Sequence, residues 1–205
     1  EKYPGHIFPM IGLHPCYVKP ETWEAELAAI RQTLDKGSFR AVGEIGIDLY
    51  WDKTTFGIQR DAFLMQLDWA IEKNLPIAVH SRDSLTELID ICRSRKDKLP
   101  HGVFHCFTGQ YEEAIALIEL GFYLGIGGVV TYKNTHLRDV LAKISPEYLV
   151  LETDSPYLPP VPHRGKRNES AYTKLVAETL SNVYQRPVDD IADMTTANAK
   201  KLFGL

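Results

Sequence analysis

Four apolar stretches of this chain each end at a side chain that can bind a metal ion. Residues 41–43 precede Glu44, residues 76–79 precede His80, residues 103–104 precede His105, and residues 148–151 precede Glu152 and Asp154. An unpaired charge at the end of a buried strand is costly unless a cation, a partner or a reaction occupies it. The pattern therefore predicts a metal site that is assembled from four strand ends.

Short apolar segments alternate with longer segments of helical period along the chain. We expect strands at residues 7–13, 41–47, 77–80, 102–107, 122–127 and 148–152, and helices at residues 21–36, 58–74, 83–95, 110–120, 135–144, 168–184 and 188–202. Nearly continuous apolar strands separated by amphipathic helices are typical of a parallel sheet covered by helices. The predicted fold class is therefore α/β.

The spacing of the candidate ligands favours a closed barrel over an open sheet. The ligands follow four different strands that are one or two strand–helix repeats apart. A barrel can direct residues from many strand ends to one rim, whereas an open sheet gathers its ligands at a switch point. We therefore predict a TIM-type (β/α)8 barrel that lacks its first two β/α repeats, and we expect residues 1–205 to form a single domain.

The composition is that of an ordinary globular protein, with 44% hydrophobic and 24% charged residues. The formal net charge of −4 attracts no polyanion by itself, so a nucleic acid would need a local basic patch or metal ions.

The three cysteines lack CxxC spacing, which argues against a disulfide framework and a zinc ribbon. Residues 1–4 do not resemble a signal peptide, and no apolar run is long enough to span a membrane. We expect a cytoplasmic protein with no membrane and no obligate protein partner.

The two imidazoles and Glu44 carry the metal prediction. Glu44 lies among glycines that let the backbone approach a bound group, and its carboxylate can bridge two cations. His80 and His105 occupy the same place in successive repeats, and with the acids they supply the mixed nitrogen and oxygen ligands that zinc, manganese or iron accepts. Taken singly, Glu44 could pair with Arg82, and each histidine could be a hydrogen-bonded core residue. Asp48 is a weaker candidate, because an acid in such a loop often caps a helix.

Asp154 is the candidate catalytic acid–base residue. It lies just before a proline-rich loop, where an aspartate can ligate a cation and accept a proton from the attacking water. Its alternative role is that of a turn residue before Pro156. Glu152 precedes Asp154 by two residues. Because side chains two residues apart on a strand point to the same side, Glu152 could support the site there.

Basic residues near the predicted rim are candidates for substrate binding. The loop after Asp154 contains His163, Arg164 and Arg167, and arginine side chains suit phosphate oxygens. This loop could equally be a solvated segment before a helix. Arg82 is a similar candidate, with a salt bridge to a rim acid as its alternative, and His14 is interpreted as facing the substrate.

Several other chemistries find no support in the sequence. Cys106 adjoins His105, but strand alternation directs neighbouring side chains to opposite faces, which argues against a cysteine nucleophile. The sequence has no G-x-S-x-G elbow, no P-loop and no Rossmann fingerprint. We therefore expect no nucleotide cofactor.

With these residues assembled, the chain resembles the TatD family of metal-dependent deoxyribonucleases, within the amidohydrolase-like barrels. The resemblance rests on ordered motifs, which are residues 12–15 (GLHP), 43–48 (GEIGID), 80–82 (HSR), 104–107 (FHCF), 152–157 (ETDSPY), 164–168 (RGKRN) and the ending from Asn198 to Gly204. The resemblance implies two divalent cations, Mg, Mn or Zn. Glu44 would bridge them, His80 and His105 would hold one, and Asp154 would serve the other.

One departure from the family pattern affects this expectation. Family members open with a His-x-His pair on the first barrel strand, which completes the metal site shared with Asp154, and no such pair occurs here. The cation at Asp154 should therefore bind weakly or not at all in this chain as given. We expect the full-length protein to be an active hydrolase and this shorter chain to be impaired.

The expected reaction is hydrolysis of phosphodiester bonds in DNA. We expect exonucleolytic attack at an exposed or single-stranded end, because a barrel mouth is a concave pocket. The main alternative keeps the metal site and changes the substrate to a small ester, lactone or amide, since one fold hosts many activities. A third reading is a scaffold whose metal site has decayed.

Overall fold

The computed structural model describes residues 5–205, so the expectation about residues 1–4 lies outside the described part. The chain divides into two compact units. The first comprises the residues up to Gly102 together with Gly204, and the second comprises Val103–Phe203 together with Leu205. The single-domain assignment stays a prediction. Within residues 5–205, no helix is both long and apolar enough to cross a membrane.

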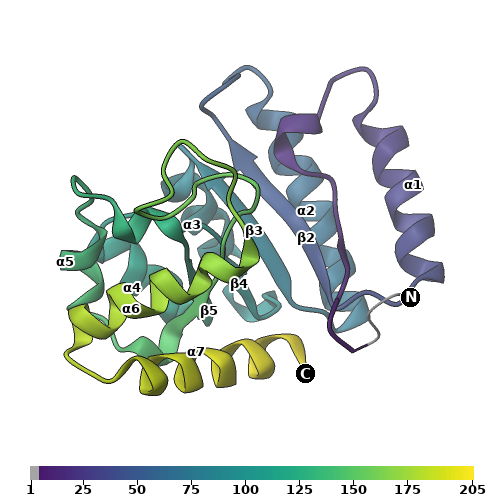
Figure 1. The fold of residues 1–205 in the computed structure, drawn as a ribbon. Coiled ribbons are helices and arrows are strands. Elements are labelled where there is room, and N and C mark those ends of the chain that lie inside the picture. Colours follow the sequence, from purple (N-terminus) through teal and green to yellow (C-terminus); the bar gives the residue numbers. More distant parts are fainter. Residues whose placement is uncertain (1–4) are drawn as a thin grey trace. The chain divides into compact units, whose positions relative to one another are not determined.

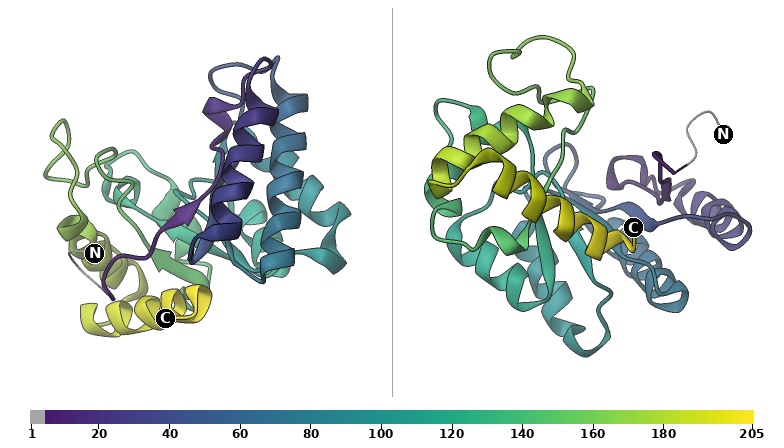
Figure 2. Two further views of the ribbon diagram at one scale, coloured as in Figure 1. Left: turned by 90° about the vertical axis from the view of Figure 1, so that its right-hand side faces the viewer. Right: turned by 60° about the horizontal axis from the view of Figure 1, so that its bottom comes forward.

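The first unit contains three parallel strands in the order β1-β2-β3. Its elements are β1 (Met10–Ile11), η1 (Pro15–Tyr17), α1 (Trp23–Lys36), β2 (Ala41–Asp48), α2 (Phe56–Lys73), β3 (Ile77–Arg82), α3 (Leu85–Ser94) and η2 (Lys96–Lys98). Helix α2 packs against β2, and α1 lies beside α2 (Figures 1 and 2). This arrangement leaves the carboxyl ends of the strands open to carry functional side chains.

The second unit continues the alternation of strands and helices. Its elements are β4 (Gly102–Phe104), which starts at the last residue of the first unit, α4 (Tyr111–Glu119), β5 (Phe122–Ile126), η3 (Gly128–Thr131), α5 (Leu137–Leu141), η4 (Pro146–Tyr148), β6 (Leu149–Leu151), η5 (Ser170–Tyr172), α6 (Thr173–Tyr184) and α7 (Val188–Phe203). Strands β5 and β6 are parallel neighbours. Helices α6 and α7 lie side by side, and α7 covers β6 (Figure 2).

All six strands are found near their expected positions, but β1, β4, β5 and β6 are shorter than predicted, β1 and β4 by the most. The first strand pairs only over Met10–Ile11. Pro9, which cannot donate to a strand ladder, precedes it, and the Leu13 backbone after it is hydrogen-bonded to Gln66. Strand β4 ends at Phe104, because Cys106 adopts a left-handed φ of +48°. Regular pairing with β5 is interrupted there, and the Phe107 N–H donates to the Gly125 carbonyl beyond the interruption. His105 therefore lies just past its strand.

Two local features of β2 aim its side chains. The register between β2 and β3 shifts between Val42 and Ile45, at the position of Glu44, and such an irregularity redirects a side chain. Gly46 has φ +147°, and a Cβ there would lie 2.0 Å from the carbonyl oxygen of His80. Only glycine allows β2 to lie this close to β3 at His80.

Two buried glutamines on one face of α2 hold the backbone beside the strand ends. Gln66 accepts a hydrogen bond from the Leu13 N–H at 2.6 Å and donates to the Leu13 carbonyl at 3.2 Å. Gln59, two helical turns earlier, accepts from the Asp48 N–H at 2.8 Å and donates to the Asp48 carbonyl at 3.1 Å. These side-chain amides bond both backbone groups of Leu13 and of Asp48, and they help to fix the positions of His14 and Asp48.

We predict that Gln66→Ala lowers the free energy of unfolding by about 1–3 kcal/mol, because it leaves the buried Leu13 N–H without its acceptor. Chemical denaturation measures the change. The matched control is Gln32→Ala, which truncates an exposed glutamine on α1 and should change stability by less than about 0.5 kcal/mol. Equal effects of the two substitutions would contradict the anchoring role of Gln66.

Candidate functional site

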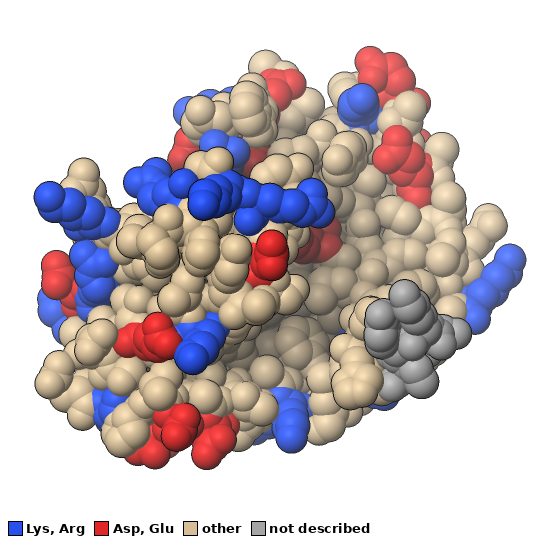
Figure 3. All heavy atoms as spheres, in the orientation of Figure 1, with Lys and Arg blue, Asp and Glu red and all other residues tan. Residues whose placement is uncertain are grey.

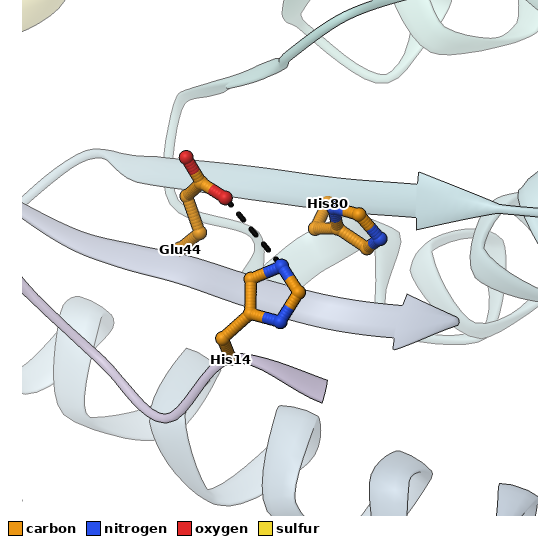
Figure 4. A group of neighbouring side chains, drawn as sticks. All are labelled: His14, Glu44 and His80. Atoms are coloured by element: carbon orange, nitrogen blue, oxygen red, sulfur yellow. Dashed lines mark ion pairs between the residues drawn. The ribbon is translucent and has the colours of Figure 1, made fainter. Parts of the chain in front are cut away.

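In the first unit, His14, Glu44 and His80 form a compact group of possible metal donors (Figure 4). His14 caps η1, Glu44 lies in β2, and His80 lies in β3. One donor atom of each residue lies within 4.8 Å of the others, and the rings of the two histidines are 4.4 Å apart between centroids. The structure thus brings Glu44 and His80 together as predicted, and it adds His14 to the group.

The hydrogen bonds of His14 indicate which of its nitrogens carries the proton. Its Nδ1 accepts a hydrogen bond from the Cys16 N–H at 3.1 Å. A neutral imidazole with an accepting Nδ1 carries its proton on Nε2, and this Nε2 lies 3.6 Å from Oε2 of Glu44. His14 is therefore placed to present an N–H toward Glu44, and its role of facing the substrate stays a prediction.

His80 is held by the buried carboxylate of Asp48. Nε2 of His80 lies 3.0 Å from Oδ2 of Asp48, which also accepts a hydrogen bond from the Cys16 thiol at 3.4 Å. Burial raises the pKa of Asp48, but the hydrogen bonds from His80, Cys16 and the Tyr50 N–H outweigh it and bring the pKa below its usual value. The ionised carboxylate places the imidazole proton on Nε2, so Nδ1 is the nitrogen with a lone pair for a cation.

Glu44 has an environment that suits a cation. Burial raises the pKa of its carboxyl group, and the nearby His14 opposes this shift. A carboxylate that burial destabilises gains from a neighbouring positive charge. One carboxylate and imidazole nitrogens on a half-buried surface form a donor set that zinc or manganese accepts. The residues present therefore fit a divalent metal ion.

In the second unit, His105 lies beside Glu152 and Asp154. Nδ1 of His105 is 3.8 Å from Oε2 of Glu152. Burial lowers the pKa of His105, and the charge of Asp154 partly opposes this shift. A histidine kept neutral by burial retains the lone pair that a metal requires. The sequence prediction that Glu152 supports the site agrees with its contact with His105.

Glu152, which follows β6, also contacts the turn that follows β4. Its Oε1 accepts a short hydrogen bond from the Cys106 N–H. A Cβ on Gly125 would lie 2.8 Å from Oε2 of Glu152 and 2.9 Å from Cα of His105, so the glycine makes room for both residues. Glu152 thereby holds the turn that follows His105.

The loop that carries Asp154 is pinned by a buried asparagine. The side-chain amide of Asn168 donates to the carbonyls of Thr153 and Tyr157, the latter at 2.6 Å, and its backbone N–H donates to the Pro156 carbonyl. Asn168 is 2% exposed. These bonds enclose Asp154 between two fixed carbonyl groups and hold it in its left-handed conformation with φ +48°.

The predicted substrate-binding residues lie on aromatic surfaces or in the exposed loop after β6. The guanidinium of Arg82 stacks over the ring of Tyr50 at 3.6 Å, so it does not need the salt bridge considered as its alternative. Arg164 stacks over Tyr132 at 4.2 Å, and His163 stacks on Tyr172 with ring centroids 4.0 Å apart. Arg167 is exposed. Figure 3 shows a row of basic side chains over the loop that follows β6.

The four predicted metal ligands fall into the two units. Glu44 and His80 lie together in the first, and His105 and Asp154 belong to the second. A centre shared by all four stays a prediction. The roles of Gln59, Gln66 and Asn168 were not predicted, and buried amides have no periodic signal in a sequence. Asp48 was ranked as a weaker site candidate because such an acid often caps a helix, and the structure places it against His80.

Comparisons with known proteins agree with these features. A family model described as TatD related DNase matches residues 1–204. The uncharacterized metal-dependent hydrolase YabD of Bacillus subtilis (strain 168) is 40% identical over 198 residues, which are 96% of this chain and 77% of YabD. The 3'-5' ssDNA/RNA exonuclease TatD of Pantoea ananatis is 33% identical over 212 residues, covering 100% of this chain and 81% of that protein.

A solved structure is similar over nearly the whole chain. The crystal structure of YJJV, a TatD homolog from Escherichia coli K12, matches with a TM-score of 0.84 and 31% sequence identity over 97% of this chain and 77% of that one. This similarity confirms the predicted fold class, which is the α/β fold of the TIM-barrel type.

We predict that Asp48→Asn weakens divalent metal binding about 10- to 100-fold, because the amide cannot orient the His80 ring as the carboxylate does. Titration calorimetry with Mn²⁺ or Zn²⁺ measures the affinity. The exposed Asp90→Asn substitution on α3 is the matched control and should leave the affinity unchanged. An unchanged affinity in Asp48→Asn would show that Asp48 does not position His80 for a metal.

Proposed function

Because this chain belongs to the TatD family of metal-dependent hydrolases, we propose that it hydrolyses phosphodiester bonds of DNA with divalent cations as cofactors. The observation that carries the proposal is the grouping of imidazole and carboxylate side chains at the strand ends, as Glu44 and His80 are grouped in the first unit, with His14 beside them. The half-buried environment and the carboxylate support of each histidine favour metal ligation over a purely structural role.

We propose Glu44, His80, His105 and Asp154 as the residues that would hold two divalent cations, Mg, Mn or Zn. Such cations would offset charge on phosphoryl oxygens and bring the pKa of a water toward neutrality. The neutral state of His105 and the Nδ1 lone pair of His80 support these assignments.

The residues of the chain then have distinct tasks in hydrolysis. The oxygen of a water forms a bond to phosphorus, and the Asp154 carboxylate accepts the proton that this water loses. The bond from phosphorus to the departing nucleoside oxygen breaks, and that oxygen takes a proton from solvent. The Asn168 hydrogen bonds keep the Asp154 loop in place, and positioning of this kind contributes a large part of enzymatic rate enhancement.

Arg82, His163, Arg164 and Arg167 are proposed to bind the phosphates of the substrate, with His14 facing the scissile group. The exposed basic loop after β6 supports this assignment (Figure 3). Single-stranded or exposed ends are the proposed substrate form, in line with the description of the Pantoea ananatis relative as a single-strand exonuclease. We propose a cytoplasmic location, because the three cysteines of the sequence lack the spacing of a disulfide framework.

The experiment is hydrolysis of an end-labelled single-stranded oligonucleotide with Mn²⁺ or Mg²⁺. We predict that Glu44→Gln, which keeps the shape of the side chain and removes its charge, lowers the rate at least 100-fold. The control is Glu24→Gln, the same change at an exposed position of α1, which should leave the rate unchanged.

The same assay separates the alternatives. Turnover of small esters, lactones or amides in the absence of oligonucleotide hydrolysis would favour a different substrate class. Oligonucleotide hydrolysis that survives in Glu44→Gln, or that proceeds fully in chelator, would contradict the proposed metal chemistry.

A further inference from the structure

A cavity of about 300 Å³ lies in the first unit beside the carboxylate that holds His80. Its lining includes Cys16, Lys19, Asp48, Trp51, Asp52 and Gln59. This volume is within the range of pockets that bind small ligands. Because Asp48 lines the cavity and also contacts His80, a ligand in the cavity would lie next to the proposed metal ligands of this unit.

Trp51 lines the cavity and forms an exposed aromatic pair with Tyr50, its neighbour in sequence. Tyr50 is 52% exposed and Trp51 is 71% exposed, and their rings meet edge to face with centroids 4.8 Å apart. The Arg82 guanidinium lies 3.6 Å from the Tyr50 ring centroid and 5.4 Å from that of Trp51. So much exposed aromatic surface contributes little to folding, and together with a stacked arginine it is the kind of surface on which nucleic-acid bases stack.

The charges of the cavity indicate which part of a nucleotide fits inside. The lining includes three carboxylates, those of Glu21, Asp48 and Asp52, and one ammonium group, that of Lys19. This balance disfavours a phosphate within the cavity and favours an uncharged group that offers N–H donors. Asp52 uses only Oδ1 for its hydrogen bonds with Thr54, so its second oxygen keeps the capacity to accept another.

We propose that this cavity binds a nucleobase of the single-stranded substrate, stacked on Trp51, while Arg82 binds the phosphate attached to that nucleotide. The proposal rests on the proposed function and extends it by naming the part of the substrate that each group recognises. Arg82 is held in place by Tyr50, whose ring centroid lies 3.6 Å from the guanidinium, so it can present its N–H groups to a phosphate without losing much side-chain freedom. Stacking accepts any base, so the site selects for a single strand and not for a sequence.

The experiment measures binding, so it does not depend on catalysis. Titration calorimetry compares deoxyadenosine monophosphate with deoxyribose 5-phosphate, which carries the same phosphate and no base. We predict that Trp51→Ala weakens binding of deoxyadenosine monophosphate about 5- to 100-fold and leaves binding of deoxyribose 5-phosphate unchanged. Trp51→Phe should restore most of the affinity, because it restores the stacking surface.

A second aromatic–arginine pair in the same unit supplies the matched control. Phe8 is 37% exposed, stacks with Arg40 and does not line the cavity. Phe8→Ala should therefore leave nucleotide affinity unchanged. The inference is overturned if Trp51→Ala binds deoxyadenosine monophosphate as tightly as the wild type does, or if the wild type does not distinguish the two ligands.

The oligonucleotide assay distinguishes a failure of this inference from a failure of the proposed function. Hydrolysis of the oligonucleotide with no dependence of nucleotide binding on Trp51 would overturn the base site and leave the nuclease proposal intact. Trp51-dependent nucleotide binding without any hydrolysis would support the base site and overturn the nuclease proposal.

Discussion

The placement of acids and imidazoles at the ends of apolar strands is the constraint on which the rest of this structure depends. Such side chains lose water when the strands are buried, and each needs a partner to offset that loss. Asp48 is 3% exposed and obtains its partners from His80, Cys16 and the Tyr50 backbone. At Glu44, burial raises the pKa of the carboxyl group, and the nearby His14 opposes the shift. The proposed divalent cation would add positive charge beside this carboxylate and so favour its ionised form.

Positioning of the candidate site relies on neutral amides more than on ion pairs. Gln59 and Gln66 on α2 and Asn168 after β6 each hydrogen-bond backbone groups beside a functional residue. Neutral amides fix the backbone without adding charge next to a metal site, so they leave its electrostatics to the ligands. A site needs such supporting residues to keep its geometry, because small displacements of reacting groups reduce rates strongly. These amides therefore connect the packing of α2 and of the proline-rich loop to catalysis.

The sequence predicted the order of strands and helices, the fold class and the residues that follow each strand. Hydrophobic period and residue type carry that information directly. It did not predict the short β1 or the left-handed Cys106 that ends β4 early. It also did not predict the Asp48–His80 bond or the stacking of Arg82 on Tyr50. Those contacts depend on side-chain rotamers and on how closely neighbouring strands lie. Neither property is indicated by a local pattern in the sequence.

The most direct test of the central claim is an anomalous difference map from crystals of the protein saturated with Mn²⁺. The account predicts cation peaks within about 2.0–2.6 Å of the carboxylate oxygens of Glu44 and Asp154, of Nδ1 of His80 and of a ring nitrogen of His105. Peaks confined to other surfaces, or saturated crystals in which these four side chains ligate no cation, would contradict it.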